Sequence, residues 1–250
     1  MYRVSPIVKQ LLIINIIFFV GSTLSFNSDF IYSLFGLYFP ENPQFKFWQI
    51  ITHMFMHGNI QHILFNMFAL WMFGSSVESI FGTKKFLFFY ITCGLGAAFI
   101  QILFLYYVFY SNLDLLVSSG YDQSSILNIL AEGKYNTSWE GVLGPKGLLD
   151  FNSSFFSSMV GASGAIMGVL VAFGMFFPDS KLMLIFLPVP IKAKYFIPGI
   201  ILLDLFSAIT GQAIFSPSNT AYVAHIGGAL TGFFIMYYWK KNQFTKNRWY

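Results

Sequence analysis

GASGAIMG, residues 161–168, sets a single serine, Ser163, among glycines at the start of an apolar segment. Residues three, four and seven positions apart lie on one face of a helix. That spacing predicts a stripe of small residues along the helix, formed by Gly161, Gly164 and Gly168. Because small residues let the backbones of two membrane helices approach closely, the stripe predicts a tightly packed partner helix.

A matching stripe lies in AHIGGALTG, residues 224–232, where His225 is followed by Gly228 and Gly232. If the two stripes face each other, Ser163 and His225 come within hydrogen-bond reach, and a bulky residue at Gly228 would push them apart. The alternative is that these are ordinary packing glycines beside a passive serine and histidine. Spacing alone does not separate the two interpretations.

The composition is that of an integral membrane protein. Of the 250 residues, 56% are hydrophobic and only 10% are charged, and the mean hydropathy is +0.64. Soluble domains carry about 25% charged residues. The formal net charge of +4 is therefore no sign of a nucleic-acid surface, and the lipid bilayer is the expected partner.

The apolar segments predict an all-α membrane protein with six transmembrane helices. A helix needs about 20 apolar residues to cross the hydrocarbon core. Asn59, which precedes the second span, is a good N-cap. Residues 1–250 are expected to form one domain, and residues 109–158 a long extracytoplasmic loop insertion with structure of its own. The six predicted spans are residues 7–25, 60–80, 85–108, 159–177, 194–213 and 221–239.

Basic residues predict the orientation of this bundle. Cytoplasmic loops of membrane proteins carry an excess of lysine and arginine, which places both termini in the cytoplasm and the acidic loops outside. The opposite loops hold only three lysines, Lys46, Lys134 and Lys146. The basic residues assigned to the cytoplasmic side are Arg3, Lys9, Lys84, Lys85, Lys181, Lys192, Lys194, Lys240, Lys241, Lys246 and Arg248.

In this topology, polar residues from three helices lie at a similar depth near the outer surface. They are His57, His62 and Asn66 at the second span, Ser163 at the fourth and His225 at the sixth. Polar groups in a membrane are costly and mark functional sites by default. A serine becomes a nucleophile when a neutral imidazole takes its proton, and the resulting oxyanion needs hydrogen-bond donors. The set predicts acyl-transfer chemistry.

Three stretches in this order resemble the rhomboid intramembrane serine proteases: HGNIQHILFNM at 57–67, GASGAIMG at 161–168 and AHIGGALTG at 224–232. FWQIITHMFMHGN, residues 47–59, is similar to the first outer loop of that family. The resemblance covers most of residues 45–240, with little match at 109–155. It implies a six-helix bundle with a water-filled cavity that opens outward.

The resemblance also implies a role for each site residue. Ser163 is expected to be the nucleophile and His225 its base, in a dyad without a carboxylate. His62 and Asn66 are expected to bind the oxyanion. His57, Gly161, Gly164 and Gly228 are expected to support the site. Substrates of the family are single-span or other membrane proteins, cut near the outer membrane face, and no cofactor or metal is expected.

Several alternatives remain open at this stage. A non-catalytic rhomboid-like protein that binds membrane clients would have the same helices. A zinc site at His53, His57 and His62 is conceivable, but Gly58 interrupts the run and no acidic residue lies nearby. Asp204 in the fifth span could orient His225, although a structural contact between helices is the preferred interpretation. The short six-span form suggests a bacterial plasma membrane.

Overall fold

The computed structural model of the protein describes residues 4–184, 187–212 and 221–246, and the chain there is mostly helical. Arg3, Ala213 and Arg248, which entered the predictions above, lie outside the described residues. The elements are α1 Pro6–Leu24, α2 Ser28–Phe35, α3 Gln49–Thr52, η1 His53–Phe55, α4 Ile60–Ala69, η2 Leu70–Gly74, α5 Ser75–Phe81, α6 Thr83–Ser118, α7 Gln123–Ala131, η3 Thr137–Trp139, α8 Glu140–Phe156, α9 Ser163–Phe176, β1 Lys181–Leu184, β2 Leu187–Lys192, α10 Ala193–Thr210 and α11 Tyr222–Lys246.

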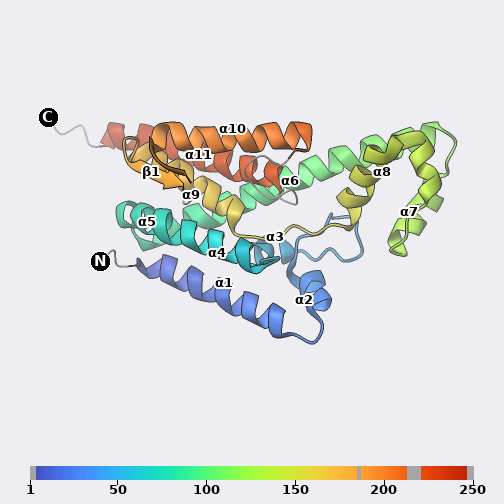
Figure 1. Ribbon diagram of the computed structural model, residues 1–250, viewed down its shortest axis with the longest axis horizontal. Helices are drawn as coiled ribbons and strands as arrows, with labels where there is room; N and C mark the ends of the chain where they lie inside the picture. The colour runs from blue at the N-terminus through green and yellow to red at the C-terminus, as the bar shows by residue number, and fades with distance from the viewer. Residues whose placement is uncertain (1–3, 185–186, 213–220, 247–250) are drawn as a thin grey trace.

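The long helices form a bundle, with α7 and α8 projecting from one end (Figure 1). The start of α1, the β1–β2 hairpin and the end of α11 lie at the other end. Among the described residues, four segments are long and apolar enough to cross a membrane, namely α1, the continuous run Ile60–Phe81, α6 and α10. The helical class is confirmed, while α9 and α11 remain predictions as spans.

Three helix boundaries differ clearly from the predicted spans. Helix α6 continues to Ser118 instead of ending at residue 108, α9 begins at Ser163 instead of 159, and α11 continues to Lys246 instead of ending at 239. The residues before α9 are extended, since Met159 pairs with Leu37 as an isolated antiparallel bridge. The start of α4 agrees with the prediction, because the Asn59 side chain accepts a hydrogen bond from the His62 N–H at 2.9 Å.

The C-terminal extension of α6 is covered by α7 and α8, so most of the expected loop at 109–158 is helical. Phe109, Leu113 and Leu116, spaced four and three residues apart, form a buried stripe on α6. They join an apolar cluster with Trp139 and Phe151. Burial of such large side chains accounts for the extra three turns of α6.

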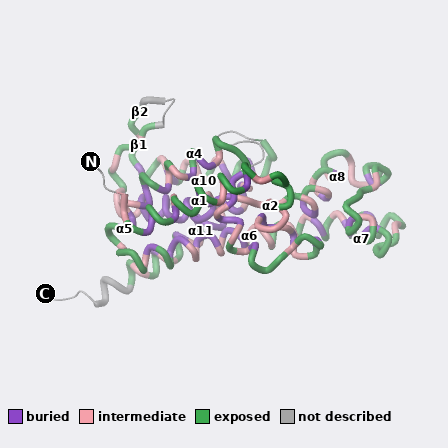
Figure 2. The backbone as a smooth tube through the Cα atoms, turned by 90° about the horizontal axis from the view of Figure 1, so that it is seen from below, coloured by how far each residue is buried: buried purple, intermediate pink, exposed green. Residues whose placement is uncertain are grey.

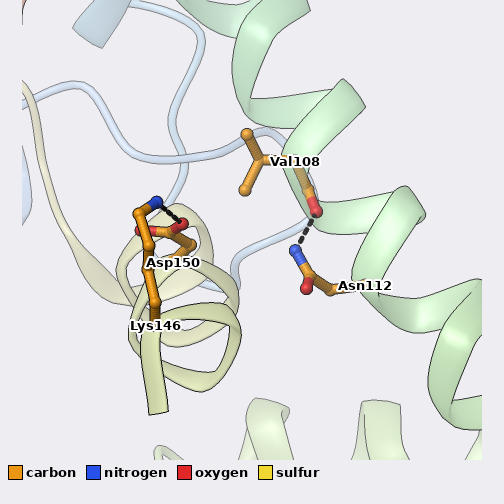
Figure 3. A network of polar contacts seen from close by, with 4 residues as sticks. All are labelled: Val108, Asn112, Lys146 and Asp150. Carbon is orange, nitrogen blue, oxygen red and sulfur yellow. Dashed lines mark hydrogen bonds and ion pairs between the residues drawn. The ribbon is translucent and has the colours of Figure 1, made fainter. Parts of the chain in front are cut away.

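The two polar contacts drawn in Figure 3 each stay within a single helix. Asn112 donates to the Val108 carbonyl on α6 at 2.7 Å, and Lys146 pairs with Asp150 on α8 at 2.6 Å. Neither contact joins α8 to α6. The apolar cluster therefore holds the two helices together, and a β-carbon at Gly147 of α8 would stand 3.4 Å from Asn112 Oδ1 of α6.

A short hairpin, missed by the sequence interpretation, connects α9 to α10. β1 and β2 are antiparallel, with Lys181 opposite Lys192 and a register irregularity between Leu182 and Leu184. Asp179 forms exposed ion pairs with the amines of Lys192 and Lys194, at 3.1 and 2.9 Å. Exposed pairs of this kind add little stability.

Buried segments gather in the interior of the bundle (Figure 2), and α9 is almost entirely buried. All its residues from Gly164 to Phe173 are buried, packed between α6 and α11. Residues around α7 and α8 are mostly exposed or half-buried. Ser163 at the first position of α9 is therefore fixed by a helix with little freedom to shift.

Glu78 of α5 fixes the start of α1. Its carboxylate accepts hydrogen bonds from the backbone N–H groups of Ile7 and Val8, both at 3.0 Å, and from the Ser5 hydroxyl. These N–H groups belong to the first turn of α1, which lacks partners within its own helix. A buried glutamate thus caps a helix that is distant in sequence.

Candidate active site

The segment between α1 and α4 holds the residues that lead into Ser163. Leu37 and Met159 exchange two backbone hydrogen bonds, at 2.9 and 2.8 Å. The Gly161 N–H donates to the His53 carbonyl at 2.9 Å. His53 is itself fixed, because its Nδ1 lies 2.8 Å from the Gln49 carbonyl oxygen. Residues 159–161, which precede α9, are therefore held at both ends: Met159 bonds to Leu37 and Gly161 bonds to His53.

Gly161 brings Ser163 and His62 to the same small space. Its φ of 125° lies in the left-handed region that favours glycine. A β-carbon there would stand 2.7 Å from His62 Nε2 and 3.6 Å from Ser163 Oγ. The imidazole of α4 and the hydroxyl of α9 therefore face one point, which only a residue without a side chain leaves open.

Helices α9 and α11 touch through backbone atoms. A β-carbon at Gly228 would overlap the Gly164 carbonyl oxygen and stand 2.7 Å from its carbonyl carbon. One turn further, a β-carbon at Gly232 would stand 2.7 Å from the Gly168 α-carbon. The two glycine stripes thus face each other. Because Gly164 follows Ser163, this contact holds the serine beside the first turns of α11, where His225 lies.

His225 has a carboxylate partner from α10. Its Nδ1 lies 2.8 Å from Asp204 Oδ2, and both side chains are largely buried, with 11% and 2% of their surfaces exposed. A carboxylate accepts hydrogen bonds from a ring N–H. The resemblance implied a dyad without a carboxylate, whereas the structure places an aspartate directly on the histidine.

The remaining predicted residues lie in the same region, on α4 and in the segment just before it. Asn66 is buried and its Nδ2 donor has no hydrogen-bond partner among the described residues. His57 packs edge-on against His62, with ring centroids 5.0 Å apart, and neither of its ring nitrogens has a partner there. Burial, followed by the charge of His62, lowers the pKa of His57 to about 3, so this ring is neutral at physiological pH.

The structure brings Ser163, His62 and His225 together but does not join all of them by hydrogen bonds. His62 and His225 lie close enough for their charges to interact. Within the described part of the chain, no hydrogen bond connects Ser163 to His225. Catalytic hydrogen bonds are often long in a free enzyme and shorten with substrate. No cluster of three or more potential metal ligands occurs among the described residues.

Comparison with known proteins identifies the family. The Rhomboid domain model matches residues 44–122 and 123–242. The chain belongs to the rhomboid family. The match includes the region 109–155, where the sequence resemblance was weakest, so the α7–α8 part belongs to the rhomboid domain as matched.

Known relatives of this rhomboid include proteins named presenilin-associated rhomboid-like protein, mitochondrial. The Homo sapiens protein is 27% identical over 221 residues and the Mus musculus protein 28%, each alignment covering 85% of this chain and 45% of the relative. A Danio rerio protein of the same name with the suffix A is 28% identical over 214 residues, covering 82% and 43%. The chain thus spans less than half the length of these relatives.

Two features of the rhomboid site were not assigned from the sequence. The sequence favours a purely structural contact for Asp204 over the contact with His225, since an isolated acid in a span carries no mark of its partner. The carbonyl of His53 was missed as the anchor of Gly161, because backbone hydrogen bonds leave no residue-specific pattern. The family match supports a multi-pass membrane protein.

Proposed function

We propose that this rhomboid is an intramembrane serine endopeptidase. Ser163 is the nucleophile, His225 the base, and His62 and Asn66 donate hydrogen bonds to the oxyanion. The free N–H groups in the first turn of α9 add further donors. His57, Gly161, Gly164 and Gly228 shape the site without touching the reacting atoms. The reaction needs no cofactor, since nucleophile, base and donors all come from side chains and backbone.

The chemistry follows from these positions. His225 accepts the Ser163 hydroxyl proton while Oγ bonds to the substrate carbonyl carbon, and the negative charge passes to the carbonyl oxygen. The C–N bond then breaks, and the imidazolium returns the proton to the leaving amine. Water, activated by the same histidine, releases the acyl group and restores the serine.

The approach of α9 and α11 at Gly164 and Gly228 is the observation that carries this proposal. That backbone contact holds the turn of α9 that carries Ser163 beside the turn of α11 that follows His225. The unpartnered, buried donor of Asn66 supports an anion site, because a buried amide without an acceptor costs free energy. An oxyanion would supply that acceptor during the reaction.

Orientation and substrates are part of the same proposal. The start of α1, the hairpin and the end of α11 share one end of the bundle, which supports placing their basic residues together in the cytoplasm. Ser163 and the 109–158 segment then lie toward the outer face. Substrates are membrane proteins whose helix unwinds there, because a regular helix hides its carbonyls.

The comparisons do not support the bacterial plasma membrane expected from the sequence. The names of the relatives contain the word mitochondrial. These names describe the relatives and do not assign a compartment to this chain. Fractionation of cells that express the chain at its natural level would decide the compartment, with a plasma-membrane marker and an organelle marker followed in parallel.

Proteolysis of a defined substrate tests the activity. The purified protein is reconstituted into liposomes with a doubly tagged single-span substrate, beside Ser163→Ala and His225→Ala. The wild type is expected to release a fragment cut near the outer end of the span, and both variants to release none. Activity that survives in either variant, or is lost with a chelator, would contradict the proposed roles.

The same experiment tests the non-catalytic alternative. A client-binding protein would retain the tagged substrate during purification but leave it intact. Retention by the wild type without any fragment would therefore favour client binding over proteolysis. Retention by Ser163→Ala alone is the expected behaviour of a protease trapped before the covalent step.

A further inference from the structure

We propose that Asp204 is a positioning residue of this site, which holds His225 in the tautomer and orientation needed to accept the Ser163 proton. The inference rests on the proposed function and adds to it a third member, from α10. It replaces the dyad implied by the sequence with a serine–histidine–aspartate arrangement.

The chemistry of the contact determines the tautomer. An ionised carboxylate offers only acceptors, so Nδ1 of His225 must carry the hydrogen in the 2.8 Å contact with Asp204. In a neutral imidazole the other nitrogen, Nε2, is then unprotonated. That nitrogen is the one left to face the serine. When Nε2 takes the proton, the imidazolium lies against a negative charge that stabilises it.

The pattern of buried and exposed residues along α10 indicates a specific role for Asp204. Within the described stretch 198–210, only Asp204 and Ser207 are buried. Both side chains face α11, Asp204 through its hydrogen bond with His225 and Ser207 through a polar contact with Tyr222. Apolar side chains of the same stretch, such as Leu202 and Ile209, are exposed. A buried carboxylate is costly unless it is paired.

A purely structural tether is the competing explanation, and Ser207 provides its control. Ser207 lies one turn from Asp204 on the same helix, is equally buried and also joins α10 to α11. It contacts Tyr222 instead of the histidine. Ser207→Ala therefore removes an interhelical polar contact while leaving the imidazole untouched.

Kinetics of substrate cleavage and of fluorophosphonate labelling separate the two roles. We expect Asp204→Asn to lower kcat roughly 10²–10⁴-fold with KM changed less than about threefold. The pH profile should also change, because the charge beside the imidazolium is lost. Asp204→Glu should restore part of the activity. Ser207→Ala should stay within about threefold of wild type in kcat and keep its pH profile.

The outcomes are distinguishable from failure of the proposed function. If Ser163→Ala is inactive while Asp204→Asn matches wild type in kcat and pH profile, only the role of Asp204 is refuted. An equal loss in Ser207→Ala and Asp204→Asn, with unchanged pH profiles, would assign Asp204 to a tether and overturn the inference. Activity that survives in Ser163→Ala would refute the proposed function itself.

A measurement on the unaltered protein covers the case in which Asp204→Asn does not fold. The chain has four histidines, so nitrogen-15 resonances of labelled imidazoles are assignable by comparison with His225→Ala. We expect neutral His225 to carry its hydrogen on Nδ1. A hydrogen on Nε2 in the wild type would overturn the inference directly.

Discussion

Gly228 of α11 lies against the carbonyl group of Gly164 of α9, so closely that a β-carbon at 228 would overlap the carbonyl oxygen. The backbone of the helix that begins with Ser163 thus meets the backbone of the helix that carries His225. The distance between the two helices therefore depends on the absence of a side chain at Gly228. The geometry of the proposed nucleophile and base depends on that distance.

Gly228→Ala should therefore lower the activity of the site more than it lowers the stability of the fold. The added methyl group has no flexible neighbour to displace, since the atoms it meets are backbone, and the helices must separate. We expect at least about a tenfold loss of fluorophosphonate labelling, because misplacement by about 1 Å can cost two orders of magnitude.

Gly21→Ala is the matched control for that substitution. Gly21 lies inside α1, and a β-carbon there would meet nothing within 4 Å. Labelling of this variant should equal wild type. Equal labelling of Gly228→Ala and wild type would show that the glycine contact does not set the catalytic geometry.

Asn66→Ala should lower kcat by roughly 10²–10³-fold with little change in KM, the usual effect of removing one oxyanion donor. The Asn66 Nδ2 donor has no partner to lose among the described residues, so stability should change little or rise. Gln61→Ala, at an exposed position of the same helix, is the control. A normal kcat in Asn66→Ala would remove this residue from the oxyanion site.

Acid should destabilise the fold through two buried histidines of the first outer loop. Burial lowers the pKa of His53 to about 4 and that of His57 to about 3, from the usual 6.5. Between these values and 6.5 the unfolded chain binds protons that the folded chain does not, so stability present above pH 6.5 is lost as the pH falls. At about pH 5 the loss is about 2 kcal/mol for each histidine.

Thermal unfolding of His57→Gln and wild type at neutral and acidic pH measures this effect. The melting temperature of the variant should fall less on acidification than that of wild type, whatever the stability of the variant at neutral pH. Parallel pH dependences in the two proteins would show that His57 is not held neutral in the folded state.

Glu78→Ala should lower the free energy of unfolding by about 3 kcal/mol, because it leaves the first N–H groups of α1 without their acceptor. Ser79→Ala, at an exposed site on the same helix where the hydroxyl bonds only to the Ser76 carbonyl, should change it by less than about 0.5 kcal/mol. Thermal unfolding in one detergent compares the two. Equal stability would mean that α1 is held by its apolar face alone.

Much of the helical framework was predictable from hydropathy. α1, the run from α4 to α5, and α10 lie within a few residues of their predicted bounds, because a membrane span must be continuous and apolar. The facing glycine stripes of α9 and α11 were also predictable, since helical spacing and side-chain size are local properties of the sequence.

Boundaries and partners set by tertiary contacts were not predictable. α6 continues past 108 because residues far along the chain, such as Trp139 and Phe151, bury its outer turns. α9 starts late because Met159 pairs with Leu37. The sequence left the partner of Asp204 open between His225 and a structural contact, since nothing in it aligns α10 with α11.

Identification of the residue that reacts with a fluorophosphonate tests most directly whether Ser163 is activated by His225. The reconstituted protein is labelled, digested and mapped by mass spectrometry, beside His225→Ala. We predict a single adduct on Ser163 in the wild type and none in the variant. An adduct on another residue, or undiminished labelling of Ser163 without the imidazole, would contradict the proposed active site.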